Sequence, residues 1–372
     1  MAQPFRHFSG RFPFLRTLDP LWAEHAWVGI ADAAPSSWSL LTALIALRQS
    51  VPTLVVVPDS RAQDRFLQDL FGYVEVLHKE TALDVLPFPV FDLLLKVEVE
   101  SPLEETGERL TALQALDDWR PSAPRVPIVV APITAMMHGV PLPRSLERFA
   151  LNLTAGRVMA RDAVVQWLLE AGYEEVGLVE AKGQFAVRGG IIDLFSVQMP
   201  GPVRVEFFGD EVDSMRLFDP VTQLQRESLT ALAVFPADEA VLAERAVGES
   251  SVCLAELFQE RGRVILTAPD ELESCADQYA AQLATRRDDT AEWLMPERVW
   301  RALAACRGVV LESGSVLSPP VPIGPLPAPA RIVAGLAATE AMEMVETGDL
   351  AGGVENEARR KQFFQQLQQW RD

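Results

Sequence analysis

The stretch that decides the fold runs from Gly183 to Pro220 and reads GQFAVRGGIIDLFSVQMPGPVRVEFFGDEVDSMRLFDP. Its short apolar runs alternate with polar residues at a period of two, the pattern of strands with one buried face. Gly189-Gly190 interrupts this alternation as a bulge or tight bend would, and Pro200-Gly201 and Gly209-Asp210 mark further turns. The stretch therefore predicts a compact antiparallel meander.

The two faces of this predicted meander differ in chemistry. Arg204 and Glu206 alternate with the apolar residues of the run 203–207, and residues two apart on a strand share a face. We therefore expect one face of Val and Phe, and a second face that carries Arg188, Arg204 and Glu206. The pattern alone leaves open whether the charged face is only solvated, which is the common case for polar surfaces.

The same stretch resembles a known family. The motif F-x-V-R-G-x-I-I-D-L-F at 185–195 is followed by R-V-E-F-F-G-D-E-V-D-S-M-R-x-F-D-P at 204–220. Together they resemble the small second domain shared by the excision-repair protein UvrB and the transcription-repair coupling factors, the Mfd family. In that family the small domain is the docking site for UvrA, so the resemblance implies UvrA as a partner.

The resemblance also implies which side chains bind UvrA. Matching the family's docking surface residue by residue points to Arg188, Phe195, Arg204 and Glu206. UvrB usually carries a further arginine where this chain has Ala186. Arginine suits such a site because its planar fork makes paired hydrogen bonds to carboxylates. For Phe195, a role in the core is an equally good interpretation.

Composition narrows the classes of function. The chain has 372 residues, enough for two or three domains, and its hydrophobic content of 49% supports a sizeable core. A net charge of −19 repels phosphate backbones, so we expect weak DNA binding by this chain itself. Three widely spaced cysteines fit reduced thiols in the cytoplasm better than a disulfide framework or a metal site. No apolar run approaches 18 residues, so no membrane association is expected.

Before the meander, strand and helix patterns alternate. Strands are predicted at 26–30 and 53–57, and helices at 38–47 and 61–71. This order is typical of a parallel sheet. The predicted fold class is α/β: a parallel-sheet, P-loop-like domain with a degenerate nucleotide site, interrupted by a small α+β domain with an antiparallel sheet. We also predict a strand at 74–77 and an irregular, proline-interrupted connector at 83–95.

The loop after the first strand lies where a P-loop would bind nucleotide. Residues 29–40 read GIADAAPSSWSL, with one glycine and no lysine, and the whole chain contains no Gly-Lys pair. A P-loop needs glycines so that its backbone N–H groups reach phosphate, and a lysine for the phosphate charge. We therefore expect no cofactor and no catalysis in this segment. The resemblance implies that ATP and Mg bind in the motor domains of longer family members.

The resemblance covers about residues 20–340 and implies a domain organisation. Residues 1–149 would form UvrB-like domain 1A, 150–218 the UvrA-binding domain 2, 219–340 domain 1B, and 341–372 a linker and the start of a following domain. Family members continue into an RNA-polymerase-binding domain and an ATP-dependent motor that translocates on DNA. The implied function is recruitment of UvrA to stalled RNA polymerase in transcription-coupled nucleotide excision repair.

Two alternatives stay open. The first is a UvrB-like ATPase that loads onto damaged DNA through a long, tyrosine-rich β-hairpin. The run from Phe91 to Ser101 is too short for that hairpin and has no tyrosine, although base stacking needs exposed aromatic faces. The second alternative is a structural α/β protein without any link to UvrA.

Overall fold

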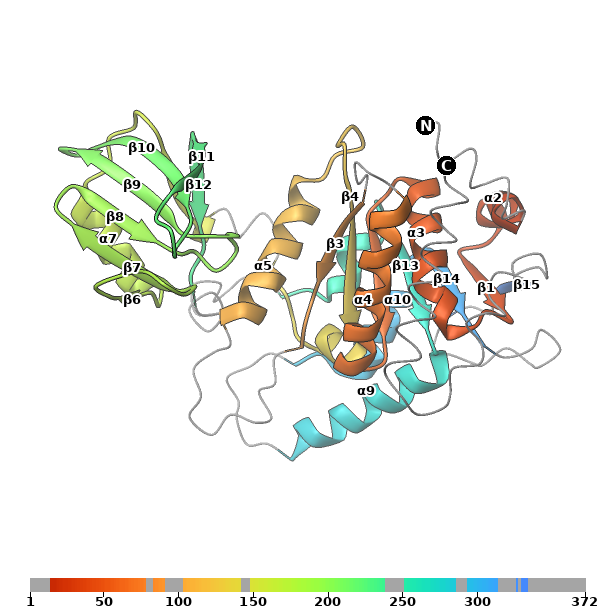
Figure 1. Cartoon of the computed structure of the whole chain (residues 1–372). Helices are drawn as coiled ribbons and strands as arrows, with labels where there is room; N and C mark the ends of the chain where they lie inside the picture. Colours follow the sequence, from red (N-terminus) through yellow and green to blue (C-terminus); the bar gives the residue numbers. More distant parts are fainter. Residues whose placement is uncertain are drawn as a thin grey trace, which may run out of the picture. The chain divides into compact units, whose positions relative to one another are not determined.

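The computed structural model describes residues 14–77, 83–90, 103–141, 148–237, 251–285, 293–313, 326 and 329–333. The chain forms two compact units, each built from separated segments (Figure 1). The large unit comprises residues 1–90, 119–139 and 253–372, and the small unit comprises 91–118 and 140–252. The expected linker at 341–372 and the run from Phe91 to Ser101 lie outside the described residues.

A seven-stranded sheet with the order β15-β1-β14-β13-β2-β4-β3 forms the centre of the large unit. Each pair of neighbouring strands is parallel, as the alternation of strands and helices predicts. The strands are β1 (Trp27–Ala31), β2 (Thr53–Val57), β3 (Leu83–Pro87), β4 (Val126–Pro132), β13 (Arg263–Thr267), β14 (Gly308–Leu311) and β15 (Ala330–Val333). The α/β fold class is thereby confirmed.

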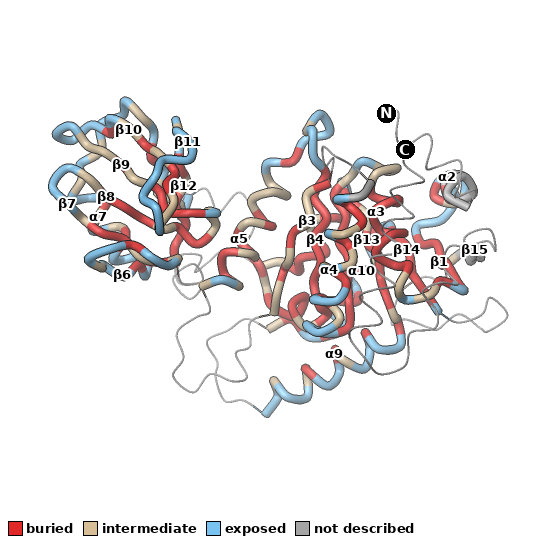
Figure 2. Tube along the Cα trace, in the orientation of Figure 1, coloured by how far each residue is buried: buried red, intermediate tan, exposed pale blue. Residues whose placement is uncertain are grey.

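Both faces of the central strands are buried. Val55 and Val57 of β2 enter one core with helices α2, α3 and α4, while Leu54 and Val56 are equally buried on the opposite face. Figure 2 shows the central strands in the red of buried residues. Such strands read as continuous apolar runs, which is why TLVVV shows no alternation. The helices of this unit are α2 (Phe14–Glu24), α3 (Trp38–Gln49), α4 (Ser60–Leu77), α9 (Pro269–Ala284) and α10 (Pro296–Ala304), with 3-10 turns η1 (Pro35–Ser37), η3 (Ile133–Met137) and η4 (Leu254–Phe258).

Two hydrogen bonds from side chains to backbone carbonyls hold the loop between β1 and α3. The indole Nε1 of Trp38 donates a hydrogen bond of 3.0 Å to the carbonyl of Ala33, and the Ser37 hydroxyl donates one of 2.7 Å to the carbonyl of Ala34. A phosphate-binding loop presents backbone N–H groups to its ligand. In this loop, the side chains of Ser37 and Trp38 instead donate hydrogen bonds to backbone carbonyls. The predicted degeneracy of the nucleotide site stays a prediction.

Two sequence predictions in the large unit are wrong. Residues 74–77 are the last turn of α4, because Val74 continues the buried stripe formed by Phe66 and Leu70 along this helix. Leu83–Pro87 forms strand β3 and pairs in parallel with β4, where an irregular connector was predicted. Proline is tolerated there because β3 is the edge strand of the sheet.

The small unit contains the predicted meander. A six-stranded sheet has the order β11-β10-β9-β8-β7-β6, and β12 pairs with β5 in a separate two-stranded sheet. Two-residue turns with positive φ at Gly189 (+58°) and Gly209 (+64°) join β7 to β8 and β9 to β10. The elements are α5 (Leu103–Asp118), β5 (Leu151–Thr154), α7 (Arg161–Glu170), β6 (Glu174–Glu175), β7 (Gln184–Arg188), β8 (Ile191–Leu194), β9 (Val203–Phe208), β10 (Glu211–Phe218), β11 (Gln225–Leu229) and β12 (Ala231–Val234).

The small unit continues past residue 218, where its end was expected from the sequence. Strand β11 pairs with β10, and β12 pairs with β5, so backbone hydrogen bonds hold both strands in this unit. The buried hydroxyl of Tyr173 adds to this connection. It donates a hydrogen bond of 2.7 Å to the carbonyl of Phe235, just after β12, and lies 3.0 Å from the Ser196 hydroxyl. Burial raises the pKa of Tyr173, so its proton stays in place as a donor.

Helix α5 packs closely against the rest of the small unit through Gly107. A Cβ atom on Gly107 would lie 2.1 Å from the backbone oxygen of Val197. Alanine normally stabilises a helix relative to glycine. We nevertheless expect Gly107→Ala to lower the free energy of unfolding by about 1–3 kcal/mol through overpacking, measured by urea denaturation. Gly177→Ala is the matched control, because a Cβ there meets open space. Equal stability of both variants would contradict this close contact.

Candidate protein-docking site

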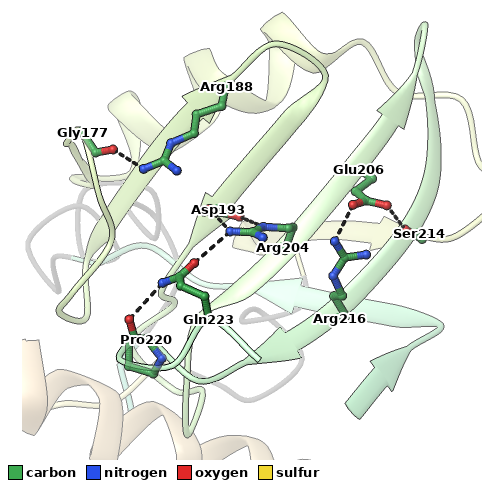
Figure 3. Close-up of polar contacts among 9 residues, drawn as sticks. All are labelled: Gly177, Arg188, Asp193, Arg204, Glu206, Ser214, Arg216, Pro220 and Gln223. Atoms are coloured by element: carbon green, nitrogen blue, oxygen red, sulfur yellow. Dashed lines mark hydrogen bonds and ion pairs between the residues drawn. The ribbon is translucent and has the colours of Figure 1, made fainter. Parts of the chain in front are cut away.

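Strand register assembles the polar face of the six-stranded sheet in two rows. The first row crosses the sheet through Ala186, Asp193, Arg204 and Arg216, and the second through Arg188, Ile191, Glu206 and Ser214. Three of the four residues predicted to bind UvrA therefore lie on one face, as the alternation of the sequence indicates. Figure 3 shows this face with its polar contacts. We call these two rows the polar face.

An ion pair between Arg204 and Asp193 occupies the middle of the polar face. The Nε and Nη2 atoms of Arg204 donate hydrogen bonds of 2.6 and 2.7 Å to the two carboxylate oxygens of Asp193 (Figure 3). Asp193 is only 2% exposed, and the guanidinium lies 4.8 Å from the ring centroid of Phe218. The hydrogen bond to Asp193 raises the pKa of Arg204. Arg204 is therefore a fixed part of the sheet.

Glu206 is held by strand β10. Its carboxylate accepts hydrogen bonds of 2.8 Å from the Ser214 hydroxyl and 2.6 Å from Nη2 of Arg216 (Figure 3). The bond from Ser214, and then the bond from Arg216, lower the pKa of Glu206. Both members of the pair are about one-quarter exposed. The pair is therefore oriented by the sheet and still accessible to another molecule.

Arg188 is the most accessible of the predicted site residues. Its side chain is exposed at the end of β7, and Nη2 donates a hydrogen bond of 2.6 Å to the carbonyl of Gly177. Within the described part of the chain, no carboxylate forms an ion pair with it. A guanidinium has five N–H donors, so Arg188 retains donors for a carboxylate on another molecule.

Phe195 lies apart from the two rows. It follows the end of β8 and is half-buried, while its backbone N–H donates to the carbonyl of Gln184 at 2.9 Å. This partial burial is compatible with both interpretations of Phe195, as a core residue and as a contact residue. Sequence reasoning missed Asp193 and Arg216. A regular two-residue turn at 209–210 would place Met215 opposite Arg204, and the bulge between Val212 and Ser214 brings Arg216 there instead, so the sequence gives no signal for this partner.

The described residues also include the chain's cysteines and its possible metal ligands. No group of three His, Cys, Asp or Glu side chains in the described ranges is arranged to hold a metal ion. The three cysteines are free thiols, and burial raises the pKa of Cys253 and Cys306 to about 12. These two thiols stay protonated and pack as small apolar side chains. None of the helices described is long and apolar enough to cross a bilayer.

The ion pair between Arg204 and Asp193 predicts that the two arginines of the first row contribute differently to the free energy of unfolding. Arg204→Ala leaves the buried carboxylate of Asp193 without its partner, and we expect it to lower the free energy of unfolding by about 3 kcal/mol. Arg216→Ala is the matched control, because its partner Glu206 is partly solvated, and we expect a loss of about 0.5 kcal/mol. Urea denaturation measures both. Losses of similar size would show that Asp193 does not depend on Arg204.

Comparison with known proteins now adds to this geometry. The family described as "UvrB interaction domain" matches residues 151–239. The transcription-repair-coupling factor of Bacillus subtilis is 30% identical over 214 residues, which cover 57% of this chain and 17% of that protein. The factor of Myxococcus xanthus is 34% identical over 194 residues, which cover 52% of this chain and 16% of that protein.

A second group of relatives carries the name UvrABC system protein B. The protein of Methanobrevibacter smithii is 31% identical over 134 residues, covering 36% of this chain and 20% of that protein. The matched region thus spans about a fifth or less of the length of these curated relatives. Residues 151–239 match the UvrB interaction domain family, in a chain that is similar over part of its length to the transcription-repair-coupling factors and to UvrABC system protein B.

Proposed function

We propose that this chain is the UvrB-like module of a transcription-repair-coupling factor and that the polar face of its small unit docks UvrA. The observation that carries the proposal is the two-row polar face, which lies within the UvrB interaction domain. One group of relatives is named as component B of the UvrABC system, which supports UvrA as the partner. The domain division expected from the resemblance, 1A, 2 and 1B, is part of this proposal.

The residues of the polar face have different roles in this proposal. Arg188 is exposed and supplies a positive charge to a carboxylate of UvrA. The pair of Glu206 and Arg216 is accessible and offers hydrogen-bonding groups of both signs. Arg204 orients the polar face without binding UvrA itself, because its guanidinium already donates to both carboxylate oxygens of Asp193. Preorganised groups lose less entropy on binding, which favours affinity. Phe195 supplies an apolar contact at the margin.

The docking role fits the charge of the chain. A net charge of −19 opposes binding to nucleic acid and leaves a protein surface as the better partner for an isolated group of arginines. In the proposed cycle, the module brings UvrA to stalled RNA polymerase in the cytoplasm. Contacts with RNA polymerase and DNA, and binding of ATP and Mg, belong to other domains of a longer protein.

A nucleotide test separates this proposal from the alternative, a UvrB-like ATPase that loads on damaged DNA. We expect no heat of binding when the chain is titrated with Mg-ATP, because the loop 32–37 lacks the glycines and lysine that bind phosphate. Isothermal titration calorimetry is the measurement, with UvrB as the positive control. Micromolar binding that is abolished by Ser36→Pro in this loop would favour the ATPase.

The docking proposal predicts a specific effect of Arg188. Arg188→Ala should weaken UvrA binding at least about tenfold, because truncating one partner of a desolvated charge pair costs about 2–5 kcal/mol. The melting temperature should stay close to that of the wild type, since the side chain is exposed. Biolayer interferometry and differential scanning calorimetry measure the two quantities.

Arg65→Ala provides the control for lost charge, because Arg65 is an exposed arginine on α4 of the large unit. It should bind UvrA like the wild type. Arg188→Lys keeps the charge but loses the planar fork, so it should fall between the two. Wild-type affinity of Arg188→Ala, Glu206→Ala and Arg216→Ala together would place the docking face elsewhere.

A further inference from the structure

A third row extends the polar face beyond Glu206. Phe208 follows Glu206 by two residues on β9, so both side chains share a face. Phe208 pairs with Glu211 across the hairpin, and Glu211 forms a further antiparallel bridge to Val158. The register thus places Phe208, Glu211 and Val158 side by side. Phe208 lies within the family motif at 204–220, but neither it nor Val158 is among the residues assigned to docking above or takes part in the polar contacts of the first two rows.

The two apolar side chains of this row are open to solvent. Phe208 is 82% exposed and Val158 is 78% exposed. Single exposed apolar residues are common on proteins and carry no message by themselves. Here two of them lie on one row, next to the row that contains both Arg188 and Glu206, at an end of the hairpin that Figure 2 shows as exposed.

The hairpin end is also held in place. Gly209 at φ +64° and Asp210 form its two-residue turn, and the N–H of Met159 donates to the carbonyl of Asp210 at 2.6 Å. The N–H of Val212 donates to the carbonyl of Arg157 at 3.0 Å. These bonds attach the segment around Val158 to the tip of the hairpin. An aromatic ring on such a support loses little entropy when a partner covers it.

Acidic residues predominate around Phe208 in the third row. Asp210, Glu211 and Asp213 are exposed near it, Arg157 is exposed beside Val158, and Arg188 and Arg216 lie in the other two rows. A partner that fits this surface needs an apolar pocket with a basic rim for Phe208, and a carboxylate for Arg188. A second copy of this chain does not fit well, because its own carboxylates would meet those beside Phe208.

We propose that Phe208, supported by Val158, is the apolar anchor of the docking face and inserts into a basic-rimmed apolar pocket on UvrA. This inference rests on the proposed function and adds a residue and a pocket chemistry to it. Aromatic residues dominate interfaces when they fill a pocket at which charged neighbours set the orientation. Phe208 supplies affinity, and the acidic residues beside it select the pocket.

The test uses the full chain and purified UvrA. Phe208→Ala should weaken binding at least about tenfold with an unchanged melting temperature, as truncation of an anchor residue does. Val221→Ala is the matched control, since Val221 is 90% exposed and lies in the loop after β10. Glu211→Lys should weaken binding more at low than at high ionic strength, because salt screens its repulsion from a basic rim.

The outcomes separate this inference from the proposed function. If wild type binds UvrA, Arg188→Ala loses affinity and Phe208→Ala does not, the anchor is wrong and the docking face stands. If the wild type does not bind UvrA, both proposals fall. If Phe208→Ala changes only self-association in sedimentation velocity, the occupant is a second copy and the inference is overturned. An equal loss in Val221→Ala would also overturn it, because the effect would not belong to the third row.

Discussion

The polar face depends on the salt bridge between Arg204 and Asp193. A carboxylate that is almost fully buried is costly unless it is paired and hydrogen-bonded. Both of its oxygens accept from one guanidinium, which in turn contacts the ring of Phe218 and the side chain of Gln223. This interaction couples β8, β9, β10 and the loop after β10. The orientation of the neighbouring charged side chains follows from it.

Much of this arrangement could be predicted from the sequence. The alternation around Arg204 and Glu206 correctly predicts a shared face, and glycine pairs correctly predict the turns. The side chains that pair across neighbouring strands could not be predicted from the sequence, because the pairing depends on strand register and on a bulge between Val212 and Ser214. Strand β11 reads QRESL and is mostly exposed, so no period-two pattern indicates that it belongs to this sheet. The extent of the small unit was therefore underestimated.

In the large unit, the burial of strands on both faces explains which of the sequence predictions were correct and which were wrong. Continuous apolar runs such as Thr53–Val57 correctly predict central strands. The same criterion misleads at residues 74–77, where the apolar end of a long amphipathic helix resembles a short strand. The loop at 32–37 lacks the glycines and the lysine of a P-loop in the sequence itself. The indole hydrogen bond that closes it could not be foreseen, because it depends on the rotamer of Trp38.

The pairing of β5 with β12 has a consequence for the history of this domain. Leu151 lies opposite Val234, so the chain arrives at and leaves the meander at neighbouring points. A segment whose two ends lie close together can be inserted into different proteins, because the surrounding chain then needs little rearrangement to accommodate it. Coupling factors and UvrABC system protein B are both among the relatives of this chain, and the family that matches residues 151–239 is described as the UvrB interaction domain. The pairing of its two ends makes the segment 151–234 portable.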